Sequence, residues 1–120
     1  MSSRRPILTE ITHVKHFAEL LHSNPGKIIL KFGATWCSPC KCIETQVYHW
    51  IDKMPSTVQS IILDIDVSYE VYAYLHQKKM IPGIPALLCY TQGNLSYVPD
   101  DSVIGADTKQ INLFFQRCMT

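Results

Sequence analysis

The stretch that decides the fold of this chain is Trp36-Cys37-Ser38-Pro39-Cys40-Lys41. The run just before it, residues 27–32, is β-branched and apolar, which is typical of a buried parallel strand. The run after it, residues 42–53, contains neither Gly nor Pro and is predicted to be a helix. The two cysteines therefore lie where a strand leads into a helix. Pro39 then falls in the first turn of that helix, where its missing N–H costs nothing.

This position has chemical consequences for the first cysteine. Unsatisfied backbone N–H groups and the positive end of the helix dipole stabilise a thiolate on Cys37. The two residues between Cys37 and Cys40 let the pair close a small ring, so oxidation and reduction need little backbone movement. The stretch therefore predicts thiol–disulfide exchange.

The composition of the chain narrows its class. Its 120 residues, 47% hydrophobic and 18% charged with a net charge of +1, predict one globular domain over residues 1–120. The near-neutral charge gives no reason to expect nucleic-acid binding, and no apolar run approaches the roughly 18–20 residues of a membrane span. Residues 1–6 lack the apolar stretch of a secretory signal, and the odd count of five cysteines argues against a fully paired secreted framework. We expect a cytoplasmic protein, and no signal for oligomerisation suggests anything but a monomer.

Hydrophobic patterns and turn residues divide the rest of the chain. They predict a short strand at 7–11, a helix at 12–22 capped by Thr12, a strand at 58–66, a helix at 68–79, a strand at 86–90, a turn at 91–94 with a return strand at 95–98 continued at 103–105, and a last helix from Asp107 or Thr108 to Cys118. This alternation predicts an α/β fold, a mixed sheet of four or five strands with about four helices on its two faces.

Four features make residues 7–118 similar to the thioredoxin family. They are Ala34–Lys41, close to the family's Trp-Cys-Gly-Pro-Cys-Lys; Asp64-Ile65-Asp66 after a strand; Gly83-Ile84-Pro85, which resembles the family's cis-proline loop; and Gly93 followed by Val103–Ala106, similar to Val-Gly-Ala. A Cys-x-x-Cys alone is a weak signal, since zinc ribbons share it, but these neighbours make it specific.

The resemblance implies a thioredoxin fold and an enzyme, a thiol–disulfide oxidoreductase that reduces protein disulfides without a cofactor. Cys37 would attack the substrate disulfide, and Cys40 would resolve the mixed disulfide. A disulfide reductase or a small thiol would recycle the pair. The apolar rim that receives the substrate would consist of Trp36, Ile84, a cis Pro85, Gly105 and Ala106.

The chain departs from the family at positions that tune the cysteines. Lys31 stands where thioredoxins have a buried Asp, and Ile62 aligns with the family's partner lysine. A charged Lys31 would favour the Cys40 thiolate and make the disulfide more oxidising, whereas a neutral one could act as a base; a lysine that merely reaches solvent is the third reading. Ser38, in place of Gly, and its neighbour Pro39 lie between the cysteines and also tune the potential.

Two further departures concern shape. Thr45 replaces a helix-kinking proline, so we expect a straighter helix. The segment from Gly93 to Gly105 is longer than in the family, and we expect residues 97–101 near the rim, where they could select partners. The alternative is a hairpin loop that lengthened at little thermodynamic cost.

Three other readings stay open at this point. If Lys31 is charged, the protein could be an oxidant or isomerase. It could instead be a non-catalytic interaction module with vestigial cysteines. Cys42, two residues after Cys40, invites a metal site, but a core or regulatory thiol is favoured and no metal is expected. Cys89 and Cys118 are most simply small core residues.

Overall fold

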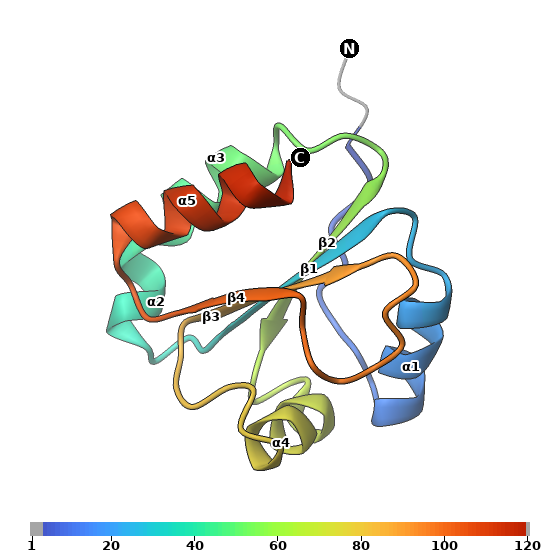
Figure 1. Ribbon diagram of the computed structural model, residues 1–120. Helices are drawn as coiled ribbons and strands as arrows, with labels where there is room; N and C mark the ends of the chain where they lie inside the picture. Colours follow the sequence, from blue (N-terminus) through green and yellow to red (C-terminus); the bar gives the residue numbers. More distant parts are fainter. Residues whose placement is uncertain (1–3, 120) are drawn as a thin grey trace.

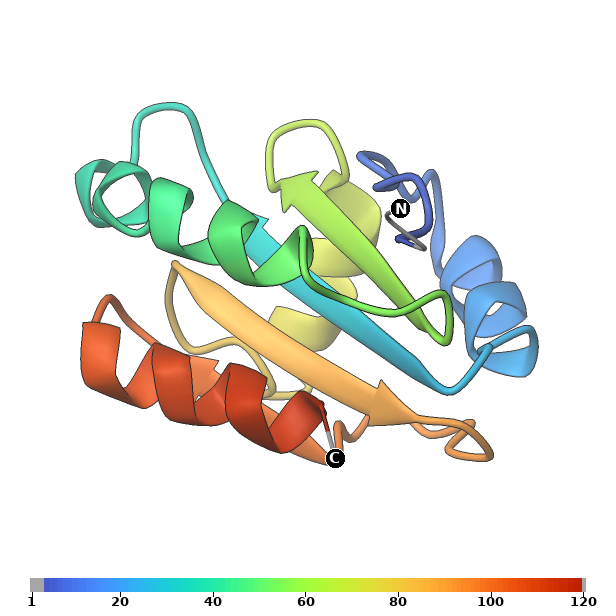
Figure 2. The same ribbon diagram turned by 90° about the horizontal axis from the view of Figure 1, so that it is seen from above.

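The computed structural model describes residues 4–119, so residues 1–3, the start of the segment considered above for a signal, and residue 120 lie outside it (Figures 1 and 2). The elements in chain order are α1 (Val14–His22), β1 (Lys27–Gly33), α2 (Ser38–Cys42), α3 (Glu44–Ile51), β2 (Val58–Asp64), α4 (Tyr69–Gln77), β3 (Ala86–Thr91), β4 (Asp101–Ile104) and α5 (Thr108–Cys118). No helix in residues 4–119 combines the length and apolar character needed to cross a membrane.

The four strands form one mixed sheet in the order β2-β1-β3-β4. β1 runs parallel to β2 and antiparallel to β3, and β4 is the antiparallel edge strand. The register pairs Phe32 with Ala86 and Lys27 with Thr91. The end of β1 that leads to the cysteines therefore lies beside the start of β3, which follows Pro85. The predicted mixed α/β sheet is confirmed.

Helices cover both faces of the sheet, with α3 and α5 on one and α1 and α4 on the other (Figures 1 and 2). Alternate side chains of β1 serve two cores. The α1/α4-side core contains, among others, Phe17, Ile28, Leu30, Phe32, Cys37, Cys40, Val71 and Leu75. The α3/α5-side core contains, among others, Ile29, Ile43, Val47, Ile51, Leu87, Cys89, Ile111, Phe114, Phe115 and Cys118.

The helix after the cysteines is not the single straight helix expected from Thr45. It is interrupted at Ile43, whose φ of −100° and ψ of 0° separate α2 from α3. Ile43 is 1% exposed and packs in the α3/α5-side core. The helix therefore breaks without a proline, at a residue whose side chain is buried. Because of this break, residues 4–119 contain five helices instead of the expected four or so.

The N-terminal predictions hold only in part. The expected strand at 7–11 is reduced to one bridge between Leu8 and Ile61. α1 begins at Val14, and its N-cap is His13 instead of Thr12, because His13 Nδ1 accepts the His16 N–H at 3.1 Å. Histidine is not among the residues that usually cap helices, so the pattern could not indicate it.

The return strand expected at 95–98 is absent, and β4 begins only at Asp101. The loop is instead fixed by contacts to β3: the Tyr90 hydroxyl donates to the Tyr97 carbonyl at 2.7 Å, and the Thr91 N–H donates to Asp100 Oδ2 at 2.7 Å. Since Thr91 pairs with Lys27, the loop lies at the end of the sheet opposite the cysteines. The expectation that residues 97–101 lie near the rim was wrong.

Candidate active site

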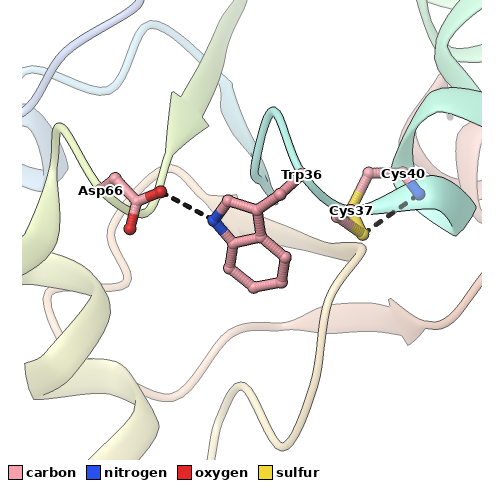
Figure 3. The surroundings of a disulfide bond; sticks show 4 residues. All are labelled: Trp36, Cys37, Cys40 and Asp66. Carbon is pink, nitrogen blue, oxygen red and sulfur yellow. Dashed lines mark hydrogen bonds between the residues drawn. A yellow bond between two sulfur atoms is a disulfide. The ribbon is translucent and has the colours of Figure 1, made fainter.

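Cys37 and Cys40 form a disulfide at the start of α2 (Figure 3). Cys37 is the N-cap of this helix, and Pro39 lies in its first turn, as predicted. The Cys40 N–H donates to Cys37 Sγ at 3.2 Å. The backbone thus offers the first sulfur a donor, which would stabilise a thiolate there when the pair is reduced. Ser38 is exposed as the first residue of α2.

Both cysteines are nearly covered in this disulfide state. Cys37 is 5% exposed and Cys40 is 3% exposed, and both pack in the α1/α4-side core. A protein partner must therefore follow the local surface closely to reach the disulfide.

Trp36 provides such a surface beside the disulfide. Its side chain is 66% exposed, and its Nε1–H donates to Asp66 Oδ2 at 2.8 Å (Figure 3). The Asp66 N–H in turn donates to Asp64 Oδ1 at 2.8 Å. An exposed aromatic ring fixed by a hydrogen bond is a typical binding surface.

The bond from Trp36 to Asp66 was not predicted, since Asp66 entered only through the family resemblance. A signal was available in the topology. β1 and β2 are parallel, so the segments after their carboxyl ends meet at one edge of the sheet. Trp36 follows β1 and Asp66 follows β2, and an indole N–H is a donor that needs an acceptor.

The other predicted rim residues come from the loop before β3 and the end of β4. The Ile84–Pro85 peptide bond is cis, as expected. Ile84 packs against the same core as the two cysteines. The Pro85 carbonyl accepts the Gly105 N–H at 2.8 Å, and Gly105 has a φ of 98°, which favours glycine. Ala106, in contrast, packs against the α3/α5-side core.

A pocket of about 440 Å³ lies next to Cys40. It is lined by Thr9, Lys31, Gly33, Ala34, Thr35, Cys40, Lys41, Glu44, Ile62, Leu63 and Asp64. Lys31 is 6% exposed and pairs with Ile62 across the β1–β2 ladder, as the family alignment implied. A Cβ placed on Gly33 would lie 3.4 Å from Cys40 Sγ and 3.5 Å from Lys31 Nζ. The Lys31 amine and the Cys40 sulfur therefore lie no more than 6.9 Å apart, the sum of these two distances.

The Lys31 amine loses its proton more readily than an exposed lysine does. Burial lowers the pKa of the Lys31 amine, and the Glu44 carboxylate opposes this shift. Within residues 4–119, no carboxylate oxygen lies within 4.0 Å of Lys31 Nζ, the distance at which the two would form an ion pair. The amine can attract a thiolate on Cys40 while charged, and it can accept a proton from this thiol while neutral.

The remaining cysteines have different surroundings. Cys42 is an exposed free thiol, whereas Cys89 and Cys118 are free and buried in the α3/α5-side core, as predicted. No pattern in the sequence indicates that these two cysteines lie together. The described residues contain no group of three or more His, Cys, Asp and Glu side chains that could hold a metal ion.

Comparisons with known proteins agree with this geometry. The family model described as Thioredoxin matches residues 8–116. Thioredoxin-2 of Pyricularia oryzae is 26% identical over 101 residues, 84% of this chain and 53% of that protein. Bifunctional thioredoxin reductase/thioredoxin of Mycobacterium leprae is 25% identical over 103 residues, 86% of this chain and 20% of that protein. The chain spans about half the length of the first curated relatives it matches.

Solved structures share the architecture. Mitochondrial thioredoxin 3 of Saccharomyces cerevisiae, in its oxidised form, superposes with a TM-score of 0.71 at 22% identity and covers 92% of this chain and 94% of that chain. At this identity the likeness concerns the fold, and it confirms the fold implied by the sequence motifs.

Proposed function

Because the chain belongs to the thioredoxin family, we propose that it exchanges dithiols and disulfides with proteins through Cys37 and Cys40. The observation that carries this proposal is the Cys37–Cys40 disulfide at the start of α2, beside the exposed and hydrogen-bonded ring of Trp36. The proposed direction is reduction of protein disulfides.

The reaction begins with both cysteines reduced. The Cys37 thiolate attacks one sulfur of the substrate disulfide, that S–S bond breaks, and the other substrate sulfur leaves as a thiolate. Cys40, after losing its proton, attacks Cys37 Sγ and releases the second substrate thiolate. Two electrons pass to the substrate, which gains two thiols, and Cys37 and Cys40 become the disulfide.

The residues around the pair have proposed roles in this cycle. The Cys40 N–H, 3.2 Å from Cys37 Sγ, favours the attacking thiolate. The apolar rim that receives the substrate chain consists of Trp36, Ile84, Pro85 and Gly105, together with Ala106, which is half-buried and also packs against the α3/α5-side core. Lys31 assists the loss of the Cys40 proton. Ser38 and Pro39, which lie between the cysteines, adjust the reduction potential of the pair.

A second candidate function is disulfide formation or isomerisation, favoured by the neighbourhood of Lys31 and Cys40. A charged amine here would stabilise the reduced pair and make the disulfide more oxidising. The reduction potential separates the two directions. A value of roughly −270 mV supports a reductant, and one between about −200 and −120 mV supports an oxidant or isomerase.

The partners follow from the same proposal. Substrates are proteins with disulfides, and a disulfide reductase or a small thiol recycles the pair. The name of the Mycobacterium leprae relative joins thioredoxin reductase and thioredoxin in one protein, which supports a reductase. We propose a cytoplasmic location and a monomeric state for this chain; Thioredoxin-3 of Saccharomyces cerevisiae, a relative, is mitochondrial.

The proposed function is tested by turnover of a protein disulfide with dithiothreitol as reductant. We expect Cys37→Ser to abolish turnover and Cys40→Ser to accumulate mixed disulfides with the substrate, while Cys42→Ser, which removes an exposed thiol, keeps full activity. Turnover that persists in Cys37→Ser would overturn the assignment. Equal inactivity of the unmodified protein and Cys37→Ser would favour the non-catalytic interaction module.

A further inference from the structure

Two buried thiols lie in one core, away from the Cys37–Cys40 site. Cys89 lies on β3 and Cys118 ends α5, and each is 3% exposed within the α3/α5-side core. The two thiols are close enough for each to shift the pKa of the other. These two cysteines are the free thiols that the proposed reaction does not use and that lie together.

An ion pair fixes the end of α5 above this part of the sheet. Cys89 is opposite Asp101 in the β3–β4 ladder. Asp101 binds Arg117 with both carboxylate oxygens, Oδ2 to Nε at 2.6 Å and Oδ1 to Nη2 at 3.0 Å. Since Arg117 directly precedes Cys118, this bidentate contact holds the last turn of α5 beside Cys89.

The charges around the pair make the two thiols unequal. The hydrogen bond with Cys118 lowers the pKa of the Cys89 thiol, and it raises the pKa of Cys118. Lys27 favours the thiolate at both sulfurs, whereas Asp101 opposes it, and Asp100 also opposes it at Cys89. Cys89 is therefore the sulfur that ionises first, and a thiolate is the form that attacks a disulfide.

Cys118 is the member of the pair that borders a pocket. It lines a pocket of about 200 Å³ together with Gly26, Lys27, Pro55, Thr57, Val58 and Met119. Lys27 begins β1, so the pocket lies at the end of that strand remote from the cysteines that follow Gly33. A small reagent can thus meet Cys118 without contacting the active site.

We propose that Cys89 and Cys118 are a second redox-active dithiol, which a low-molecular-weight disulfide oxidises to an intramolecular disulfide between β3 and the end of α5. The Cys89 thiolate takes the proton of the Cys118 thiol, and the resulting Cys118 thiolate attacks the small disulfide, whose S–S bond breaks and releases one small thiolate. This thiolate takes the proton back from Cys89, and the Cys89 thiolate then attacks Cys118 Sγ and releases the second small thiolate, which gains its proton from water. The two cysteines lose two electrons, and the small disulfide becomes two thiols.

The test uses the full chain with Cys37→Ser and Cys40→Ser, so that only the other three cysteines can react. After incubation with hydroxyethyl disulfide, the remaining thiols are alkylated, and we expect a peptide that joins Cys89 to Cys118 and weighs two hydrogens less than its two reduced parts together. Trypsin cuts after Lys79, Lys109 and Arg117, so the peptide of residues 80–109 should appear linked to residues 118–120.

Matched variants identify the pair. Adding Cys89→Ser or Cys118→Ser to the double variant should abolish the linked peptide, whereas adding Cys42→Ser should leave its yield unchanged. The unmodified protein, mapped in parallel, should show the same link together with the Cys37–Cys40 disulfide. The proposal is overturned if peptides 80–109 and 118–120 stay separately alkylated while Cys37–Cys40 is fully oxidised, or if the link joins Cys42 instead. Neither result depends on the proposed reductase activity.

Discussion

Lys31 Nζ and Cys40 Sγ lie 3.5 and 3.4 Å from one point, the position that a Cβ on Gly33 would occupy. Glycine leaves this point empty, so no side-chain atom of residue 33 separates the amine from the sulfur. Lys31 is also buried on a strand whose partner at this level is the apolar Ile62. We therefore expect the protonation of Lys31 to affect the stability of the reduced cysteine pair.

We expect Lys31→Met to make the Cys37–Cys40 disulfide harder to reduce. The variant removes a positive charge that stabilises the Cys40 thiolate of the reduced form, so the reduction potential should fall by on the order of 30 mV, equivalent to about 1.4 kcal/mol. Equilibration of both proteins with glutathione buffers at pH 7 measures the shift.

Lys41→Met is the matched control for this change. Lys41 directly follows Cys40 and lines the same pocket, but it is exposed, so solvent screens its charge and the potential should move much less. Equal shifts in the two variants would show that burial of Lys31 is unimportant. No shift in Lys31→Met would make Lys31 a bystander.

Lys31→Met should also stabilise the oxidised protein, by an amount that depends on pH. Burial lowers the pKa of Lys31 below its ordinary 10.5, so between the two values the unfolded chain holds more protons than the folded one. Stability of the wild type therefore rises with pH in this window. Lys31→Met should gain about 1–3 kcal/mol at pH 7, as for removal of an unpaired buried polar group, and the gain should shrink as the pH approaches 10.5. Urea unfolding at several pH values measures it, and a gain that grows with pH would contradict the assignment.

Two glycine substitutions should act in opposite directions. A Cβ on Gly33 would meet only ordinary van der Waals contacts, so Gly33→Ala should stabilise the fold by about 0.4–1 kcal/mol through the unfolded chain. A Cβ on Gly26 would lie 2.6 Å from the Thr57 carbonyl oxygen, which accepts the Lys27 N–H. Gly26→Ala should therefore cost about 1–3 kcal/mol. Thermal or urea unfolding compares them, and the same sign for both would refute the packing argument.

The sequence predicted those features that repeat or that lie close together along the chain. The apolar period of residues 27–32 and the cysteine turn placed β1 and the start of α2 correctly. Features set by distant contacts were missed. The break at Ile43 accompanies burial of its side chain, and the loop after Thr91 is fixed by the Tyr90 contact to Tyr97.

In the candidate site, too, local features were predicted and those set by distant contacts were missed. The disulfide could be anticipated from four consecutive residues. The neighbourhood of Lys31 and Cys40 depends on the empty space at Gly33, and the bond between Trp36 and Asp66 joins residues 30 positions apart. Such contacts need the strand order before they can be inferred.

We expect Tyr90→Phe to loosen the loop at residues 92–100. Tyr90 is fully buried, and its hydroxyl donates to the Tyr97 carbonyl at 2.7 Å, so the variant leaves this acceptor without its donor. The cost should be about 1–2 kcal/mol in urea unfolding, with faster amide exchange in the loop. In Tyr97→Phe the lost hydroxyl makes no hydrogen bond to the described residues, so this control should cost much less. Equal costs would contradict the role of the Tyr90 bond.

Asp66 acts as a positioning residue that holds the Trp36 ring through the indole N–H. Asp66→Ala removes the acceptor of the indole N–H, so the ring should lose its fixed orientation beside the disulfide. We expect kcat/KM for a protein disulfide to fall about fivefold, the equivalent of about 1 kcal/mol for one hydrogen bond. A small disulfide does not need the rim, and its rate should stay the same.

Three controls separate this role from a general loss of stability. Asp66→Asn keeps an oxygen that can accept the indole N–H, so it should restore most of the rate. Asp52→Ala removes a carboxylate whose partner is Arg4, at 3.4 Å, and should leave both rates unchanged. In a Trp50→Phe background, the fluorescence anisotropy of Trp36 should fall in Asp66→Ala and recover in Asp66→Asn. If the small-disulfide rate falls in parallel, or if Asn behaves like Ala, Asp66 does not act through the indole.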